Sequence, residues 1–140
     1  MWKELLLELT RDNPYVKINP PATNEDILEV EKSLNVSLPN QLKNLLMEFN
    51  GDNYFVFSTR EIIEVNTCVR KMEGYMPLDC LLFVAGNGCG DYLGYPITSW
   101  GINYSDIFLW EHESDNRVFK ANGLKDLIEK YYTSDVEQIV

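Results

Sequence analysis

The sequence feature that most limits the possible folds is the stretch of residues 81–97, where an apolar run breaks into glycines and then resumes. Apolar residues 81–85 lead into Gly86, and Gly88 and Gly90 follow at alternate positions. Since glycine tolerates positive φ and leaves room for close backbone approach, this alternation predicts a tight, irregular turn between two strands. Asp91 follows directly, so the turn either binds a ligand or only shapes the fold.

The glycine spacing differs from that of nucleotide-binding loops. A dinucleotide fingerprint is G-x-G-x-x-G leading into a helix, and a phosphate-binding P-loop is G-x-x-x-x-G-K-S/T. Here the spacing is G-x-G-x-G, and the residues that follow are typical of a strand. We therefore expect these glycines to be structural, and we expect no cofactor.

The periodicity of apolar residues predicts a mixed fold. Helical spacing predicts helices over residues 2–9, 24–34, 39–49 and 60–68 and a last helix after Asn122. Asn50 or Gly51 is expected to be the left-handed residue that ends the third helix. Strands are expected at residues 54–57, 78–85, 92–97, 107–110 and 118–119, with a polar connection over residues 98–105. Short connections favour antiparallel pairing, so residues 1–140 are predicted to form one α+β domain, an antiparallel sheet flanked by N-terminal helices and a C-terminal helix.

The charge of the chain restricts its partners. The sequence holds 12 Lys and Arg against 22 Asp and Glu, a net charge of -10, which would repel nucleic acid and anionic membrane surfaces. A partner attracted by charge should be basic. The three cysteines show neither a disulfide framework nor metal-ligand spacing, and no signal peptide or membrane span is evident, so a cytoplasmic protein with reduced thiols is expected.

Residues 72–116 contain no Lys or Arg. The same stretch holds seven carboxylates: Glu73, Asp79, Asp91, Asp106, Glu111, Glu113 and Asp115. A solvated acidic face that maintains solubility is one interpretation. The other is a field of one sign that captures a basic protein surface quickly.

His112 is the only histidine, which excludes a multi-histidine metal site. It could act as a general base near Asp91 or Asp106, but no nucleophile stands in a recognisable setting, so we expect no enzyme activity and no metal. Aromatic residues gather in the same part of the chain without the basic groove of a base-stacking site. They are expected to fill the core, with some of them anchoring a protein interface.

The order of these features resembles the SMI1/KNR4 (SUKH) superfamily from about Pro20 to Tyr132. The resemblance rests on the acidic amphipathic helix 24–34 followed by Leu38-Pro39, a second helix and Phe49-Asn50-Gly51; on the glycine turn 86–92; and on residues 107–113. One departure is Asp52, which stands where the family often has a second glycine.

The resemblance implies an immunity protein of the bacterial type, which binds and neutralises a polymorphic or contact-dependent toxin, here a nuclease with a basic surface. The alternative is a non-catalytic scaffold that recruits a cellular protein linked to the cell wall or to signalling, and a third is a small hydrolase using Asp91 and His112. The expected partner-binding residues are Asp91, Tyr92, Trp100, Asp106, Glu111, Glu113 and Asp115.

Overall fold

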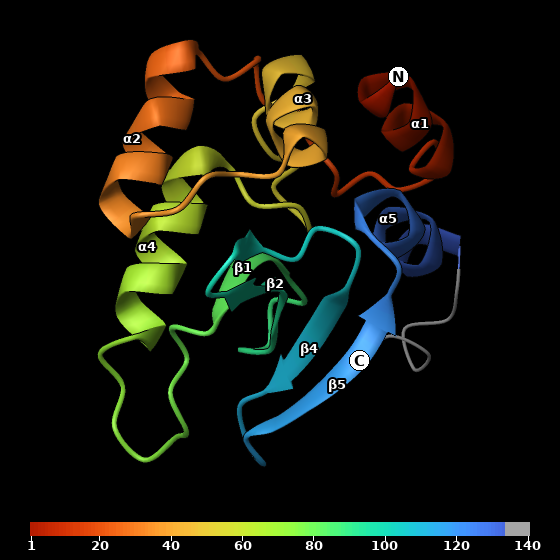
Figure 1. Cartoon of the computed structure of the whole chain (residues 1–140). Coiled ribbons are helices and arrows are strands. Elements are labelled where there is room, and N and C mark those ends of the chain that lie inside the picture. Colours follow the sequence, from red (N-terminus) through yellow and green to blue (C-terminus); the bar gives the residue numbers. More distant parts are fainter. Residues whose placement is uncertain (134–140) are drawn as a thin grey trace.

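The computed structural model describes residues 1–133, and in this part of the chain four helices precede the sheet and one follows it (Figure 1). The helices are α1 (Trp2–Leu9), α2 (Asn24–Leu34), α3 (Asn40–Glu48), α4 (Thr59–Val69) and α5 (Leu124–Thr133). The strands are β1 (Leu81–Gly86), β2 (Tyr92–Thr98), β3 (Gly101–Ile102), β4 (Ile107–Glu111) and β5 (Asn116–Ala121).

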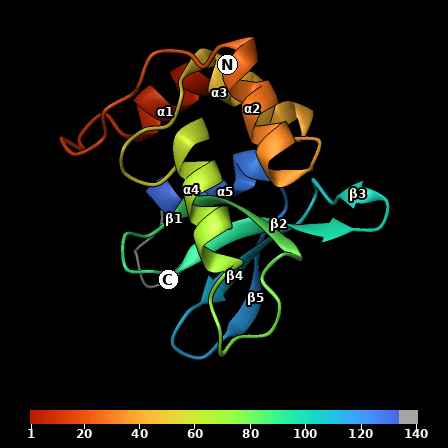
Figure 2. The same cartoon turned by 90° about the vertical axis from the view of Figure 1, so that its left-hand side faces the viewer.

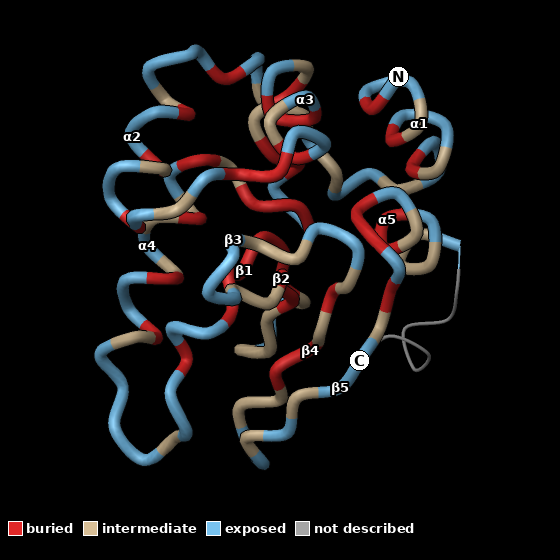
Figure 3. The backbone as a smooth tube through the Cα atoms, viewed as in Figure 1, coloured by how far each residue is buried: buried red, intermediate tan, exposed pale blue. Residues whose placement is uncertain are grey.

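Side-chain caps define where α2 and α4 begin. The Thr23 hydroxyl accepts the Asp26 amide, and the Asp26 carboxylate accepts the Thr23 amide in return. Ser58 and Glu61 form the same reciprocal pair at the start of α4. Each pair satisfies amides that the first helical turn leaves free. Figure 3 shows the result: both helices alternate buried and exposed residues around their turns, as expected of helices with one side against the core.

The sheet has the order β1-β2-β4-β5, with β3 paired to β2 beside this path, and every pairing is antiparallel. The predicted α+β class is therefore confirmed. The run of residues 107–110 is apolar on both faces, which is typical of a strand inside a sheet, and β4 does lie between β2 and β5. The short returning strand expected at residues 118–119 is longer, over the range of β5 given above.

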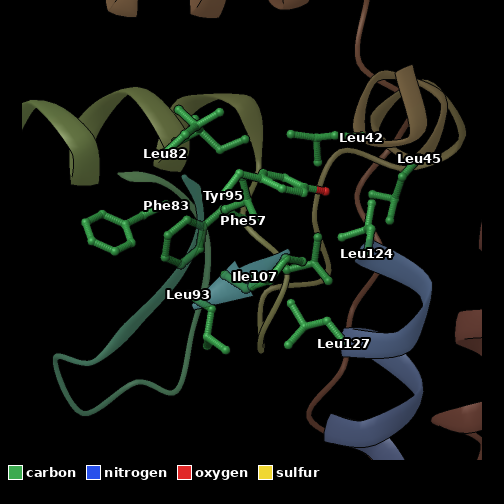
Figure 4. Packing of buried hydrophobic residues seen from close by; sticks show 14 of the residues in the cluster. Leu42, Leu45, Phe57, Leu82, Phe83, Leu93, Tyr95, Ile107, Leu124 and Leu127 are labelled. Atoms are coloured by element: carbon green, nitrogen blue, oxygen red, sulfur yellow. The ribbon is translucent and has the colours of Figure 1, made fainter. Parts of the chain in front are cut away.

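Helices cover the sheet on both faces. Tyr95 points towards Leu42 of α3, and Ile107 points towards Leu124 and Leu127 of α5, in Figure 4. On the other face α4 crosses β1, as the view in Figure 2 makes clear. Beside α4, the rings of Phe83 and Tyr75 enclose Trp110, which is 1 % exposed.

A buried side chain joins α4 to the edge strand β1. The side-chain amide of Asn66 donates to the carbonyl oxygens of Ile62 (2.7 Å) and Phe83 (2.9 Å), and the Phe83 amide donates to Asn66 Oδ1 (2.9 Å). Further along β1, the Phe57 amide donates to the Val84 carbonyl, and the Gly86 amide donates to the Phe55 carbonyl. The outer side of β1 is thus bonded to a helix side chain and to a loop.

Two expectations from the sequence were wrong. Residues 54–57 do not form a strand; a single bridge joins Val56 to Ala85. The amides of Phe55 and Val56 are instead bound by the carboxylate of Asp52, so they cannot enter a ladder. Residues 98–105, expected to be a connection, contain β3, because Thr98 and Gly101 pair across a two-residue turn.

Candidate functional site

The antiparallel sheet divides the seven expected partner-binding residues into two groups. Tyr92 at the start of β2 lies opposite Trp110 near the end of β4, so residues 91, 92, 111, 113 and 115 share the end of the sheet that carries the glycine turn. Trp100, in the β2–β3 hairpin, and Asp106, before β4, lie at the opposite end. The length of β4 separates the two groups by roughly 15 Å. We call the first group, with His112, the acidic end of the sheet.

Asp91 links the glycine turn to the turn between β4 and β5. Its Oδ1 accepts the backbone amide of His112 (3.0 Å) and lies 2.6 Å from His112 Nδ1, while its Oδ2 accepts the side-chain amide of Asn87 (3.3 Å). Burial raises the pKa of Asp91, but the hydrogen bonds from His112 and Asn87 outweigh it and lower the pKa below its usual range. The carboxylate is therefore stabilised in its charged form.

The Asp91–His112 contact is the pairing that a hydrolase hypothesis requires. Asp91 also accepts the backbone amide of His112. The same oxygen thus bonds both the main chain and the ring of the residue that begins the β4–β5 turn. The contact therefore forms a structural connection between the two turns.

The glycine turn needs its glycines for different reasons. Gly88 and Gly90 have φ values of +80° and +96°, a region that side chains rarely adopt. A Cβ on Gly90 would also meet the His112 ring at 3.1 Å. Gly86 has an ordinary φ, but a Cβ there would lie 2.9 Å from the Tyr92 ring.

The loop after α3 is similarly tight. Gly51 has φ +84°, and a Cβ on it would lie 2.6 Å from the Ser58 amide nitrogen. Asn50 bonds the same segment, because its Oδ1 accepts the Thr59 amide at 2.7 Å and its side-chain amide donates to the Thr59 hydroxyl. Asn50 and Gly51 thus hold the loop after α3 against the start of α4.

Asp115 makes intramolecular bonds that the sequence did not indicate. Its Oδ1 accepts the Trp110 indole N–H (2.8 Å) and the Arg117 guanidinium (3.1 Å), and its Oδ2 accepts the Met76 amide (2.8 Å). The Met76 amide, Trp110 and Arg117 bonds together lower the pKa of Asp115. Asp115 therefore connects the 70–80 loop to the sheet. Arg117, which lies just outside the lysine- and arginine-free stretch, neutralises the charge of Asp115.

The remaining expected contact residues differ in exposure. Glu113 is exposed and Glu111 half-buried at the acidic end. Tyr92 is half-buried, with its ring packed against Phe57 and Phe83. Trp100, by contrast, is 98 % exposed at the tip of its hairpin. Trp100 is thus accessible to a partner, and Trp is enriched among the residues that dominate binding at interfaces.

A groove that the sequence did not indicate lies beside the glycine turn. It has a volume of about 240 Å³ and lies between α4, residues 53–57 and the turn. Phe57, Tyr92, Glu61 and Val65 are among the residues that line it, and we call it the aromatic groove. The spacing of Glu61, Val65 and Cys68 on one side of α4 was the available signal, but nothing in the sequence placed this side next to Tyr92.

Within residues 1–133, no three His, Cys, Asp or Glu side chains lie close enough together to hold a metal ion. None of the helices in the same range has the length and apolar character that crossing a membrane requires.

Comparison with protein families places most of the chain in one family model. The model of the SMI1 / KNR4 family (SUKH-1) matches residues 21–130. This range includes the acidic end of the sheet and the aromatic groove, while α1 lies outside it. A search of curated proteins gives no match.

Proposed function

The chain belongs to the SMI1/KNR4 (SUKH-1) family, known for generally non-catalytic immunity proteins, and from this premise we propose that it binds and neutralises a cognate toxin domain. The toxin we propose is a nuclease with a basic surface. Binding alone achieves neutralisation, because a protein that covers the phosphate-binding Lys and Arg of a nuclease excludes its substrate.

The observation that carries this proposal is the acidic end of the sheet. Residues 72–116 supply carboxylates without a Lys or Arg, and the antiparallel pairing of β2 and β4 gathers several of them at one place. A surface of one sign speeds the encounter with a surface of the opposite sign. The net charge of -10 acts in the same direction at longer range.

The structure suggests separate roles for the expected contact residues. Asp91 and Asp115 already have several intramolecular partners, so they contribute to the field and to the shape of the turns. Glu111 and Glu113 can contact a partner without breaking such a network. Trp100 and Asp106 lie too far away to belong to the same small contact patch, so we propose that they form its other margin or a second contact.

Co-expression with the toxin domain encoded beside its own gene tests this function. We expect cells that carry both proteins to survive and the two proteins to purify together. Death of the co-expressing cells without a complex would contradict immunity for that pair. A partner recovered from the envelope or signalling machinery, with no protection from any neighbouring toxin, would instead support the scaffold alternative.

The charge mechanism can be tested separately from survival. The double variant Glu111→Gln/Glu113→Gln should lower the association rate with the toxin about three- to tenfold at low salt, and the difference should shrink as salt screens the charges. The control is Glu4→Gln/Glu8→Gln, which removes the same charge from exposed positions of α1. Equal effects of the two variants would show that only net charge matters.

A further inference from the structure

We infer that the aromatic groove binds a cationic side chain, an arginine or lysine that a basic partner inserts beside the glycine turn. This inference rests on the proposed function in one respect: the toxin is the protein that carries the inserted side chain. The binding property itself belongs to the groove and can be measured without a toxin.

Aromatic rings form one wall of the groove. The Phe57 and Tyr92 rings lie with centroids 5.8 Å apart and planes at 69°, which is an edge-to-face arrangement. Gly86 lies between them, since a Cβ on it would be 2.9 Å from Tyr92 and 3.0 Å from Phe57. The missing side chain therefore lets both rings pack onto the turn. Ring faces attract cations because their π electrons are partly negative.

The carboxylate of Glu61 lines the groove. Glu61 Oε1 accepts the Ser58 amide at 2.9 Å, and this bond fixes the side chain at the first turn of α4. Among the described residues that line the groove, Glu61 is the charged one, and none is Lys or Arg. A groove lined by a fixed carboxylate and by aromatic rings matches the charge and the apolar stem of Arg or Lys, whose methylenes pack on apolar surface while the head stays polar.

The site is suited to a side chain rather than to a large ligand. Its volume of about 240 Å³ is below the usual range for small-molecule pockets, roughly 300–1,000 Å³. It also opens next to the residues that we propose as contacts, since Tyr92 belongs both to the groove and to the acidic end of the sheet. A partner attracted by the acidic end therefore also meets Tyr92, which lines the groove beside the same turn.

The test is a titration of the isotopically labelled protein with Nα-acetyl-arginine amide, followed by NMR. We expect saturable shifts of the Phe57 and Tyr92 ring signals. Nα-acetyl-citrulline amide, which has the same shape without the charge, should cause little change. Equal shifts with both ligands, or no shift at these rings, would overturn the inference.

A charge-neutral variant shows whether the carboxylate takes part. Glu61→Gln keeps an oxygen for the Ser58 amide, so the start of α4 should remain intact. We expect it to weaken arginine binding at least about threefold. The control is Glu64→Gln on the same helix, whose carboxylate pairs with Arg60 outside the groove and whose loss should leave binding unchanged. An equal loss in both variants would indicate general charge attraction and contradict a specific site.

The outcomes for the groove and for the proposed function are distinguishable. If co-expressed cells survive but the arginine amide does not bind, the immunity function stands and the groove inference fails. If the amide binds but no neighbouring toxin is neutralised, the groove remains a cation site and the proposed partner is wrong.

Discussion

Replacing Asp52 by alanine should destabilise the fold by about 3–7 kcal/mol, because this buried carboxylate satisfies several groups at once. Its Oδ1 accepts the amides of Tyr54 (3.0 Å), Phe55 (2.8 Å) and Val56 (2.9 Å), and its Oδ2 accepts the Tyr132 hydroxyl of α5. The carboxylate is 0 % exposed. It therefore determines the path of the loop after α3 and also connects this loop to the last helix.

The magnitude follows from the groups that the substitution leaves without a partner. The amides of Phe55 and Val56 are buried, and each costs about 1–3 kcal/mol when left unsatisfied. The Tyr54 amide is only part-buried and can bond water, and the Tyr132 hydroxyl adds about 1 kcal/mol. The sum is a large part of the stability of an ordinary domain, about 5–15 kcal/mol.

Urea unfolding monitored by tryptophan fluorescence measures this loss, since Trp110 is buried. The Asp52→Ala variant should unfold at a much lower urea concentration with an unchanged dependence on urea. The matched control is Asp52→Asn, which keeps one oxygen for the three amides and should lose only about 1–2 kcal/mol at pH 4. A loss below about 1 kcal/mol in the alanine variant would refute the reasoning, because the amides would then have other partners.

The pH dependence of the asparagine control has a defined sign. Burial raises the pKa of Asp52, although the hydrogen bonds from Tyr132 and the three amides oppose it. The stability that the neutral carboxylic acid of Asp52 contributes is thus fully present below pH 3.8, the ordinary pKa of Asp, and is lost as the pH rises through the folded pKa. The deficit of Asp52→Asn relative to the wild type should therefore shrink between pH 4 and pH 7. A deficit that grows over this range would contradict the assignment.

Three further predictions concern other parts of the molecule. Because the pKa of Asp91 is lowered, the stability that this carboxylate contributes should be present above pH 3.8 and lost as the pH falls through the folded pKa. In urea unfolding, Asp91→Asn should therefore differ most from the wild type near pH 6 and least in acid. Asn66→Ala should lower the unfolding free energy by about 2–4 kcal/mol, since Phe83 would lose both of its bonds to that side chain; a change below about 1 kcal/mol would contradict this. Trp100→Ala should change the unfolding free energy by less than about 0.5 kcal/mol but weaken toxin binding in a calorimetric titration, and unchanged affinity would remove Trp100 from the interface.

The helices were predictable because burial on one side leaves a periodic signal. Ile27, Val30 and Leu34 have the spacing of one helical face in the sequence, and all three are buried. The sequence offers Thr23 as a cap for α2 and either Ser58 or Thr59 as a cap for α4, and the structure has Thr23 and Ser58 in these positions. Such elements depend on residues within one or two turns, so a single sequence contains most of the information.

The errors arose where distant or unusual partners decide the backbone. Residues 54–57 have the composition of a strand, but the Asp52 carboxylate binds the amides that a strand would use. Composition cannot reveal that competition. The β2–β3 hairpin was missed because its strand has only two residues, Gly101 and Ile102, too few for an alternating pattern.

The candidate site was predictable in composition but not in arrangement. The acidic stretch was visible, yet strand direction decides which of its members meet. Since β2 and β4 run in opposite directions, Asp91 contacts His112 at one end of the sheet. Asp106 lies at the other end, although in sequence it is nearer than Asp91 to Glu111. The aromatic groove depends on a further contact, between α4 and the glycine turn, that no local pattern predicts.

The bonds that Asn66 and residues 55–57 make to β1 also affect how copies of this chain can aggregate. An exposed strand edge invites pairing with another chain, and fibres grow when both edges of a sheet accept a neighbour. Here the edge at β1 is already occupied, whereas β5 is the outer strand on the other side in the described part of the chain. Two copies could join through β5, but a third copy would meet only β1 edges. Polymerisation by sheet extension would thus stop at a dimer.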